Sequence, residues 1–171
     1  MKPSLRDFDI AFTGLKLGEH SFDYQLDNTF FSLFEYDEFL GANLNAEVKL
    51  NKKETSLEWH MEISGSVNVP CDVTNQPFDL PLHNELEFVV KFGDEYDDSR
   101  DEILIIPAGD HKLNIAQYLY EMSVLALPLK RVSEEGKKLQ EEEESLPESS
   151  EPEHTDGEID PRWNKLKDLL S

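Results

Sequence analysis

The sequence predicts an α+β domain: a mainly antiparallel β-sheet, or a partly closed barrel, with one main helix packed on it. Three observations indicate this fold. Apolar and polar side chains alternate along most of residues 1–106, a later stretch has apolar side chains at helical spacing, and an acidic tail follows. Half-polar alternation favours antiparallel sheets with one buried face, because successive side chains of a strand point to opposite sides.

The strands are predicted in order along the first two-thirds of the chain. Six segments are typical of strands: residues 8–12, 22–26, 44–50, 57–71, 78–92 and 103–106. Residues 51–54 read as a hairpin connection, and Gly65 interrupts its strand in the manner of a bend or bulge. Residues 94–100 are polar and acidic, which predicts a solvated loop rather than a calcium site.

Two segments depart from the strand pattern. Residues 28–34 are apolar at helical as well as strand spacing and are predicted to form a short helix. The main helix is predicted from Asn114, which can cap it, to Leu127, because Pro128 closes it. Its apolar stripe consists of Ile115, Tyr118, Leu119, Met122 and Leu125.

The tail differs from the rest of the chain. We predict one domain over residues 1–132, an acidic disordered linker over 133–158, and a short C-terminal helix over 159–171. Asp160 can cap this last helix, with Pro161 at its first position. A helix this short is not stable alone in water, so it must dock on its own domain or on a partner.

The charge of the chain argues against tight binding of naked RNA. The net charge is −21, and residues 1–132 alone hold 24 acidic and 11 basic side chains. Nucleic-acid binding draws its affinity from lysine and arginine, and no cluster of them compensates here. We therefore expect weak or no direct RNA binding and a basic protein partner, although the charge can also serve solubility alone.

Other features point to a cytoplasmic, non-enzymatic protein. Cys71 is the single cysteine, which excludes an intramolecular disulfide and fits a reducing compartment. The chain has no signal-peptide-like apolar run and no stretch long enough to span a membrane. No phosphate loop, catalytic triad or metal-ligand spacing is present, so we expect no enzymatic activity, no cofactor and no metal.

Five residues are candidates for contact with a partner. The terminal segment Asp160, Pro161, Arg162 and Trp163 is the first candidate, because Trp and Arg are enriched in binding hot spots. The competing interpretation is that this segment docks on the protein's own sheet. Glu121, inside the main helix, is the second candidate, and a simple solvent-facing position is the competing interpretation.

The order of motifs resembles the YceD family, the large ribosomal RNA subunit accumulation proteins. The resemblance rests on an ordered set of segments: Phe12-x-Gly14-Leu15-x-x-Gly18, Phe30-Phe31, Ile63 to Asp72 with Pro77-Phe78, Asn114-Ile115 to Tyr120-Glu121, Leu125 to Pro128, and Asp160 to Trp163 with Leu166. It implies a non-enzymatic bacterial protein that supports accumulation of large-subunit ribosomal RNA.

The family-motif turn, which contains Cys71, Asp72, Pro77 and Phe78, departs from the family pattern. The resemblance implies a Cys-x-x-Cys pair here in many members, but Thr74 replaces the second cysteine. Structural zinc usually needs four Cys or His ligands, so metal binding is not expected. We interpret Cys71 as a small, partly buried side chain rather than a reactive thiol, because no basic residue is near it in sequence.

Two functional hypotheses remain. The first is a ribosome-biogenesis factor that acts through protein contacts. The alternative is a small-ligand-binding β module, whose cavity would be lined by Trp59, Phe78, Phe88 and Phe92. The competing interpretation of these aromatic side chains is that they simply fill the core.

Overall fold

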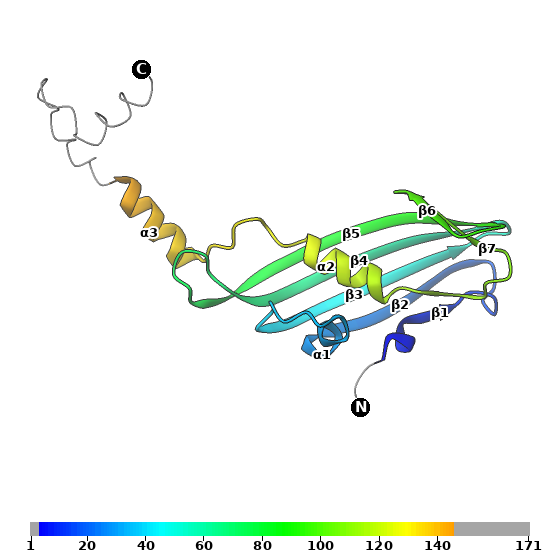
Figure 1. Ribbon diagram of the computed structural model, residues 1–171, viewed down its shortest axis with the longest axis horizontal. Helices are drawn as coiled ribbons and strands as arrows, with labels where there is room; N and C mark the ends of the chain where they lie inside the picture. Colours follow the sequence, from blue (N-terminus) through cyan, green and yellow to red (C-terminus); the bar gives the residue numbers. More distant parts are fainter. Residues whose placement is uncertain (1–3, 146–171) are drawn as a thin grey trace, which may run out of the picture. The chain divides into compact units, whose positions relative to one another are not determined.

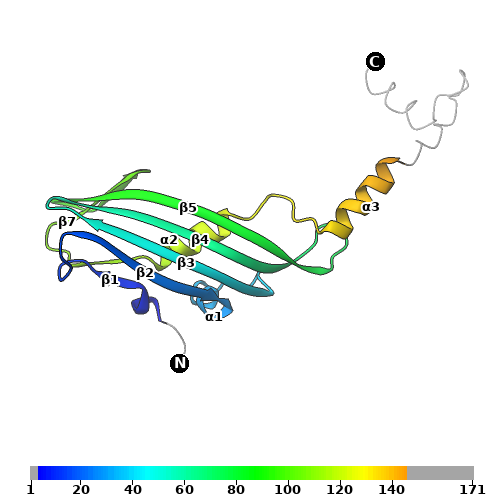
Figure 2. The same ribbon diagram turned by 180° about the vertical axis from the view of Figure 1, so that it is seen from behind.

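The computed structural model describes residues 4–145 of the 171-residue chain (Figures 1 and 2). Its first compact unit ends at Gly136. The elements in chain order are η1 (Leu5–Phe8), β1 (Asp9–Ala11), β2 (Gly18–Asp27), α1 (Asn28–Phe31), η2 (Ser32–Phe34), β3 (Gly41–Lys52), β4 (Ser56–Pro70), β5 (Pro77–Gly93), β6 (Asp97–Arg100), β7 (Ile103–Pro107), β8 (Lys112–Asn114), α2 (Ala116–Leu125) and α3 (Glu134–Ser145).

The strands form two sheets. Six lie in the order β2-β3-β4-β5-β7-β6, and β1 pairs with β8 in a small second sheet. All neighbours are antiparallel except β5 and β7, which run parallel. The predicted α+β class and the mainly antiparallel sheet are confirmed. The large sheet ends at β2 on one side and β6 on the other, so it is open and does not close into a barrel.

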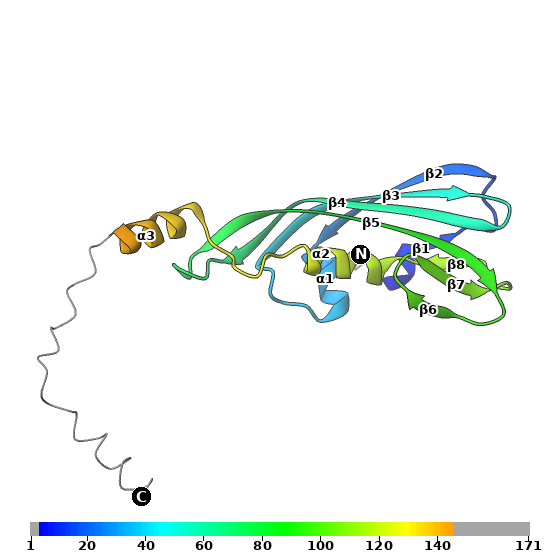
Figure 3. The ribbon, with the colours of Figure 1, turned by 90° about the horizontal axis from the view of Figure 1, so that it is seen from above.

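The core lies against one face of the large sheet. Figure 3 shows α1, α2 and the β1–β8 pair all on this face. Side chains that alternate along β3 and β4 supply its centre, and all of them are at most 2 % exposed: Leu44, Ala46, Val48, Leu50, Leu57, Trp59, Met61 and Ile63. Burial of this apolar surface is the main favourable term in folding, and the period of two sends the polar side chains to the other face.

The helices are fixed by local capping and by contacts with the sheet. Asp27 begins α1, because its carboxylate accepts hydrogen bonds from the N–H groups of Thr29 and Phe30 at 2.9 and 3.2 Å. The predicted main helix begins at Ala116, two residues later than expected, and Asn114 accepts from its N–H at 3.1 Å. The side chain of Asn84 on β5 donates to a carbonyl of α2 at 2.9 Å, which ties the helix to the sheet.

Four further features differ from the sequence expectation. The acidic loop contains the short strand β6, which pairs with β7, and β8 was not predicted. Helix α3 occupies the start of the predicted disordered linker, whose residues 146–158 lie outside the described residues. Gly65 has φ +144° but causes no shift in the β3–β4 register. It is therefore a point of close approach rather than a bulge, because a Cβ there would overlap the carbonyl oxygen of Asn43.

Candidate functional site

The face of the large sheet opposite the core carries the polar side chains that alternate along its strands. No other element of the compact unit covers it (Figure 3). Every second side chain of β2, β3, β4 and β5 points to it, because a strand sends successive side chains to opposite sides. We call it the open face, and its charges determine what it can bind.

Four carboxylates form a row across four neighbouring strands of the open face. Asp23 on β2 lies opposite Glu47 on β3. Glu62 on β4 lies opposite Glu47 on one side and Glu85 on the other. Side chains directly opposite each other in an antiparallel pair are about 5 Å apart at Cβ, and like charges there destabilise the pairing. We call this set the carboxylate row; it is an arrangement that stability alone does not favour.

The carboxylate row is only partly neutralised. Lys49 Nζ lies 3.1 Å from Glu47 Oε1, and His83 Nε2 lies 3.0 Å from Glu62 Oε1. Among the residues that the structure describes, the two outer carboxylates, Asp23 and Glu85, form no ion pair. The side chains of Glu47 and Glu62 remain 41 % and 37 % exposed, so both can still meet a partner.

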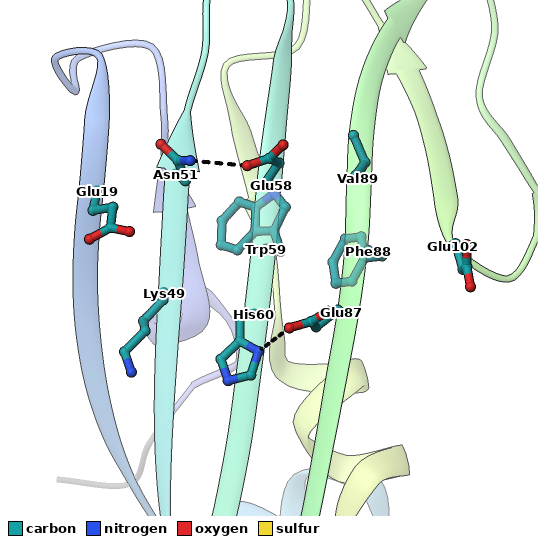
Figure 4. A pocket seen from close by; sticks show the side chains of 10 residues that line it. All are labelled: Glu19, Lys49, Asn51, Glu58, Trp59, His60, Glu87, Phe88, Val89 and Glu102. Atoms are coloured by element: carbon teal, nitrogen blue, oxygen red, sulfur yellow. Dashed lines mark hydrogen bonds and ion pairs between the residues drawn. The ribbon is translucent and has the colours of Figure 1, made fainter.

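A hollow of about 600 Å³ lies on the open face beside this row (Figure 4). Four carboxylates are among its lining residues: Glu19, Glu58, Glu87 and Glu102. His60 Nδ1 lies 2.9 Å from Glu87 Oε1, and Lys49 is the one lysine or arginine among the lining residues. The hollow therefore extends the negative surface of the carboxylate row and suits cationic groups rather than phosphates.

The turn after β4 is held by contacts with a segment far along the chain. The N–H and Oγ of Ser133 both lie within hydrogen-bond distance of Cys71 Sγ, at 3.3 and 3.4 Å. The backbone N–H of Asp72 donates to the Arg131 carbonyl at 2.7 Å, and the N–H of Arg131 donates to the Asp72 carboxylate at 2.6 Å. These reciprocal bonds fasten residues 131–133 to the turn.

The same contacts act on the thiol of Cys71, which is 2 % exposed. Burial by itself raises the pKa of this thiol, but hydrogen bonds from Ser133 and Thr74 outweigh it and lower the pKa to about 6. Sequence analysis could not foresee this pKa, because Ser133 is 62 residues away from the cysteine. These hydrogen bonds favour the thiolate over the neutral thiol, because the ionised sulfur is the stronger acceptor.

Comparison with known proteins places the chain in a family. The sequence model of the family described as large ribosomal RNA subunit accumulation protein YceD matches residues 59–170, more than half of the chain. The chain belongs to the YceD family. Neither the comparison with curated proteins nor that with solved structures gives a match.

The YceD match begins at Trp59 and therefore includes Glu62 and Glu85 of the carboxylate row, the Cys71 turn and α2. It confirms the resemblance found in the sequence. The family description ties YceD proteins to accumulation of the large ribosomal RNA subunit, which agrees with the first functional hypothesis.

In this YceD chain the family-motif turn is braced by hydrogen bonds. Thr74 stands where many members are expected to have a second cysteine, and both Thr74 and Ser133 form hydrogen bonds with Cys71.

Within residues 4–145 no group of three or more His, Cys, Asp and Glu side chains could hold a metal ion. Over the same range, no helix is both long and apolar enough to cross a membrane.

The predicted contact residues divide into two groups. Asp160, Pro161, Arg162 and Trp163 lie outside the described residues. Glu121 is exposed on α2 and accepts a hydrogen bond from Gln117, one turn earlier in the same helix, at 2.8 Å. Its carboxylate lies on the rim of a second hollow, on the core side of the sheet.

The aromatic side chains considered for a ligand cavity serve mainly the core. Trp59 and Phe88 are 2 % and 6 % exposed and stack with ring centroids 6.2 Å apart. Phe78 packs at the margin of the core, whereas Phe92 is 38 % exposed. Trp59 and Phe88 also line the first hollow, but neither of the two hollows has all four aromatic side chains in its lining.

Proposed function

We propose that this chain supports accumulation of large-subunit ribosomal RNA as a non-enzymatic factor, and that it acts by binding a basic protein on the open face. Membership of the YceD family supports the link to ribosomal RNA. The single observation that supports the protein contact is the carboxylate row, in which like charges lie opposite one another across four strands.

A basic protein segment suits this face for an electrostatic reason. Lysine or arginine side chains laid across the row would each meet carboxylates that repel one another in the free protein. Binding would replace this repulsion by attraction, and the acidic surface would also speed the encounter with a cationic partner. Such a contact can shield the positive charge of a ribosomal protein until it reaches its place on the RNA.

Direct binding of RNA is disfavoured by the same charges. A phosphate backbone brought to the open face would meet the carboxylate row and the four carboxylates of the neighbouring hollow. Lysine and arginine supply most of the affinity for nucleic acids, and Lys49 is the only such residue lining the hollow. We therefore expect weak or no binding of naked ribosomal RNA at physiological salt.

The test compares two variants with the same change of charge in cells depleted of the native protein. The row variant carries Asp23→Asn, Glu47→Gln, Glu62→Gln and Glu85→Gln. The control variant neutralises four exposed loop residues instead: Glu54→Gln, Asp94→Asn, Glu95→Gln and Asp110→Asn. Affinity purification with crosslinking identifies the bound proteins, and gradient profiles quantify the large-subunit RNA.

We expect the control variant to capture ribosomal proteins and restore large-subunit RNA as the wild type does. The row variant should lose about tenfold in captured protein, as expected when about 1.4 kcal/mol of binding free energy is lost, and should fail to restore the RNA. Equal performance of both variants, or unchanged RNA after depletion, would show the proposal to be wrong. Submicromolar binding of naked ribosomal RNA with a steep salt dependence would contradict the proposed contact with a basic protein, but not the role in RNA accumulation.

A further inference from the structure

The second hollow forms a groove of about 630 Å³ beside α2, on the core side of the sheet. Its floor is apolar and consists of Leu86, Phe88, Leu104 and Leu113. Tyr118 of α2 stacks on Phe88 with ring centroids 5.0 Å apart, and its partly buried side chain lines the groove. The groove thus combines an apolar floor with polar groups around it, as peptide- and ligand-binding sites do.

The rim of this groove is acidic. Asp98, Asp101 and Glu121 lie on it, whereas Arg100 is the one lysine or arginine among its lining residues. The exposed Tyr96 donates its hydroxyl hydrogen bond to Asp98 at 3.4 Å and adds an aromatic wall. The rim therefore carries an excess of two negative charges above an apolar floor.

The phenol of Tyr118 reports this negative surrounding. Burial and, to a smaller extent, the nearby Tyr96, Glu121 and Asp98 together raise the pKa of Tyr118 to about 12. Tyr96, Asp98 and Glu121 line the same groove as Tyr118. A cation entering the groove meets two carboxylates and two aromatic rings, which attract it by charge and by cation–π interaction.

We propose that this groove binds a protein segment in which a large aliphatic side chain adjoins a lysine or arginine. The aliphatic side chain covers Leu86 and Leu113, and the cation lies between Asp98 and Glu121 with Tyr96 beside it. Charge complementarity selects this occupant over an acidic or purely apolar segment. Tyrosine-rich surfaces of this kind are typical of binding hot spots.

The groove is separate from the open face, because it lies on the opposite side of the large sheet with α2 and the β6–β7 pair around it (Figure 3). None of its lining residues belongs to the carboxylate row. It shares only one lining residue with the first hollow, Phe88, which is almost fully buried. The proposal therefore stands without the proposed function, and the two can fail independently.

The experiment uses the full chain and three labelled peptides of equal length. One alternates leucine with lysine, one replaces each leucine by serine, and one replaces each lysine by glutamate. Fluorescence anisotropy gives the affinities, and amide chemical shifts locate the binding. We expect the leucine–lysine peptide to bind at least tenfold more tightly than either relative and to shift the amides of α2 and β6.

Two exposed substitutions in the groove test its role without disturbing the core. Tyr96→Ser and Glu121→Lys should each weaken binding of the leucine–lysine peptide by about tenfold, the ordinary effect of removing a hot-spot residue. The row variant described above should still shift the groove amides. Unchanged affinity in both groove variants, equal affinity for the serine–lysine peptide, or shifts confined to the open face would each overturn the proposal.

Discussion

Replacement of Glu62 by glutamine is expected to make the protein more stable at low salt. Glu62 suits this test because carboxylates lie directly opposite it on both neighbouring strands, Glu47 on β3 and Glu85 on β5. Its ion-pair partner is His83, whereas Glu47 lies beside the permanently charged Lys49. Glutamine keeps the size of the side chain, and its amide oxygen can still accept the hydrogen bond from His83. The substitution therefore removes one negative charge and little else.

The size of the effect follows from the register. Two unit charges about 5 Å apart in water repel by about 0.8 kcal/mol, and Glu62 faces two such charges. Lys49 and, when protonated, His83 offset part of the repulsion. We therefore expect a gain of about 1 kcal/mol in the free energy of unfolding at low ionic strength, within the range measured for cross-strand pairs.

Urea denaturation at low salt and at about 1 M salt measures this gain in the free energy of unfolding. The gain should largely disappear at about 1 M salt, because charges are screened within about 3 Å at that concentration. Glu54→Gln is the matched control, since Glu54 lies in the turn between β3 and β4 and faces no carboxylate across a strand pair. A Glu62→Gln protein no more stable than the control at low salt would refute the idea that the carboxylate row is strained by repulsion.

Four further predictions concern the framework of the domain. Gly65→Ala should lower the free energy of unfolding by about 2–4 kcal/mol, because Gly65 has a positive φ and the added Cβ would overlap the neighbouring strand. Gly109→Ala is the control: a Cβ there meets open space, so the free energy of unfolding should change by less than about 0.5 kcal/mol. Ser133→Ala should raise the pKa of Cys71 from about 6, as read from thiolate absorbance, and an unchanged pKa would contradict the assigned hydrogen bonds. The folded state binds the Cys71 thiol proton more weakly than the unfolded chain does, so ionisation of this thiol stabilises the fold. The free energy of unfolding of the wild type, relative to that of Cys71→Ala, should therefore rise from pH 6 to pH 9. Below pH 6 the stabilisation by the thiolate should be lost. Lys52→Met should cost about 1–2 kcal/mol and open the β1–β2 loop to proteolysis, because the Lys52 ammonium donates to two carbonyls there at 2.8 Å.

The two faces of the sheet were predictable from the sequence, but the carboxylate row was not. Alternation assigns Glu47 and Glu62 to the polar face without any knowledge of pairing. The short β3–β4 turn also fixes their register, so that this one pair was within reach of sequence analysis. Asp23 and Glu85 were not, because longer connections separate β2 from β3 and β4 from β5.

Contacts between distant segments explain the other omissions. Strand β7 runs parallel to β5, and its apolar sequence indicates burial but not its neighbour or direction. The three residues of β8 are too few to show alternation, and only their pairing with β1 makes them a strand. The low thiol pKa of Cys71 likewise depends on a serine brought close by tertiary structure, which a search of the flanking residues for basic side chains cannot find.

Stability and recognition are divided between the two faces of one sheet. The apolar side chains of β3 and β4 are almost wholly buried on one face, so the favourable burial does not depend on what the other face carries. The open face can therefore hold like charges, although their repulsion amounts to about 1 kcal/mol for each of the two inner carboxylates of the row, Glu47 and Glu62. A partner that neutralised these charges would recover that free energy on binding. If the row serves recognition, substitutions along it should raise stability and weaken binding together, whereas a row without a function should show only the first effect.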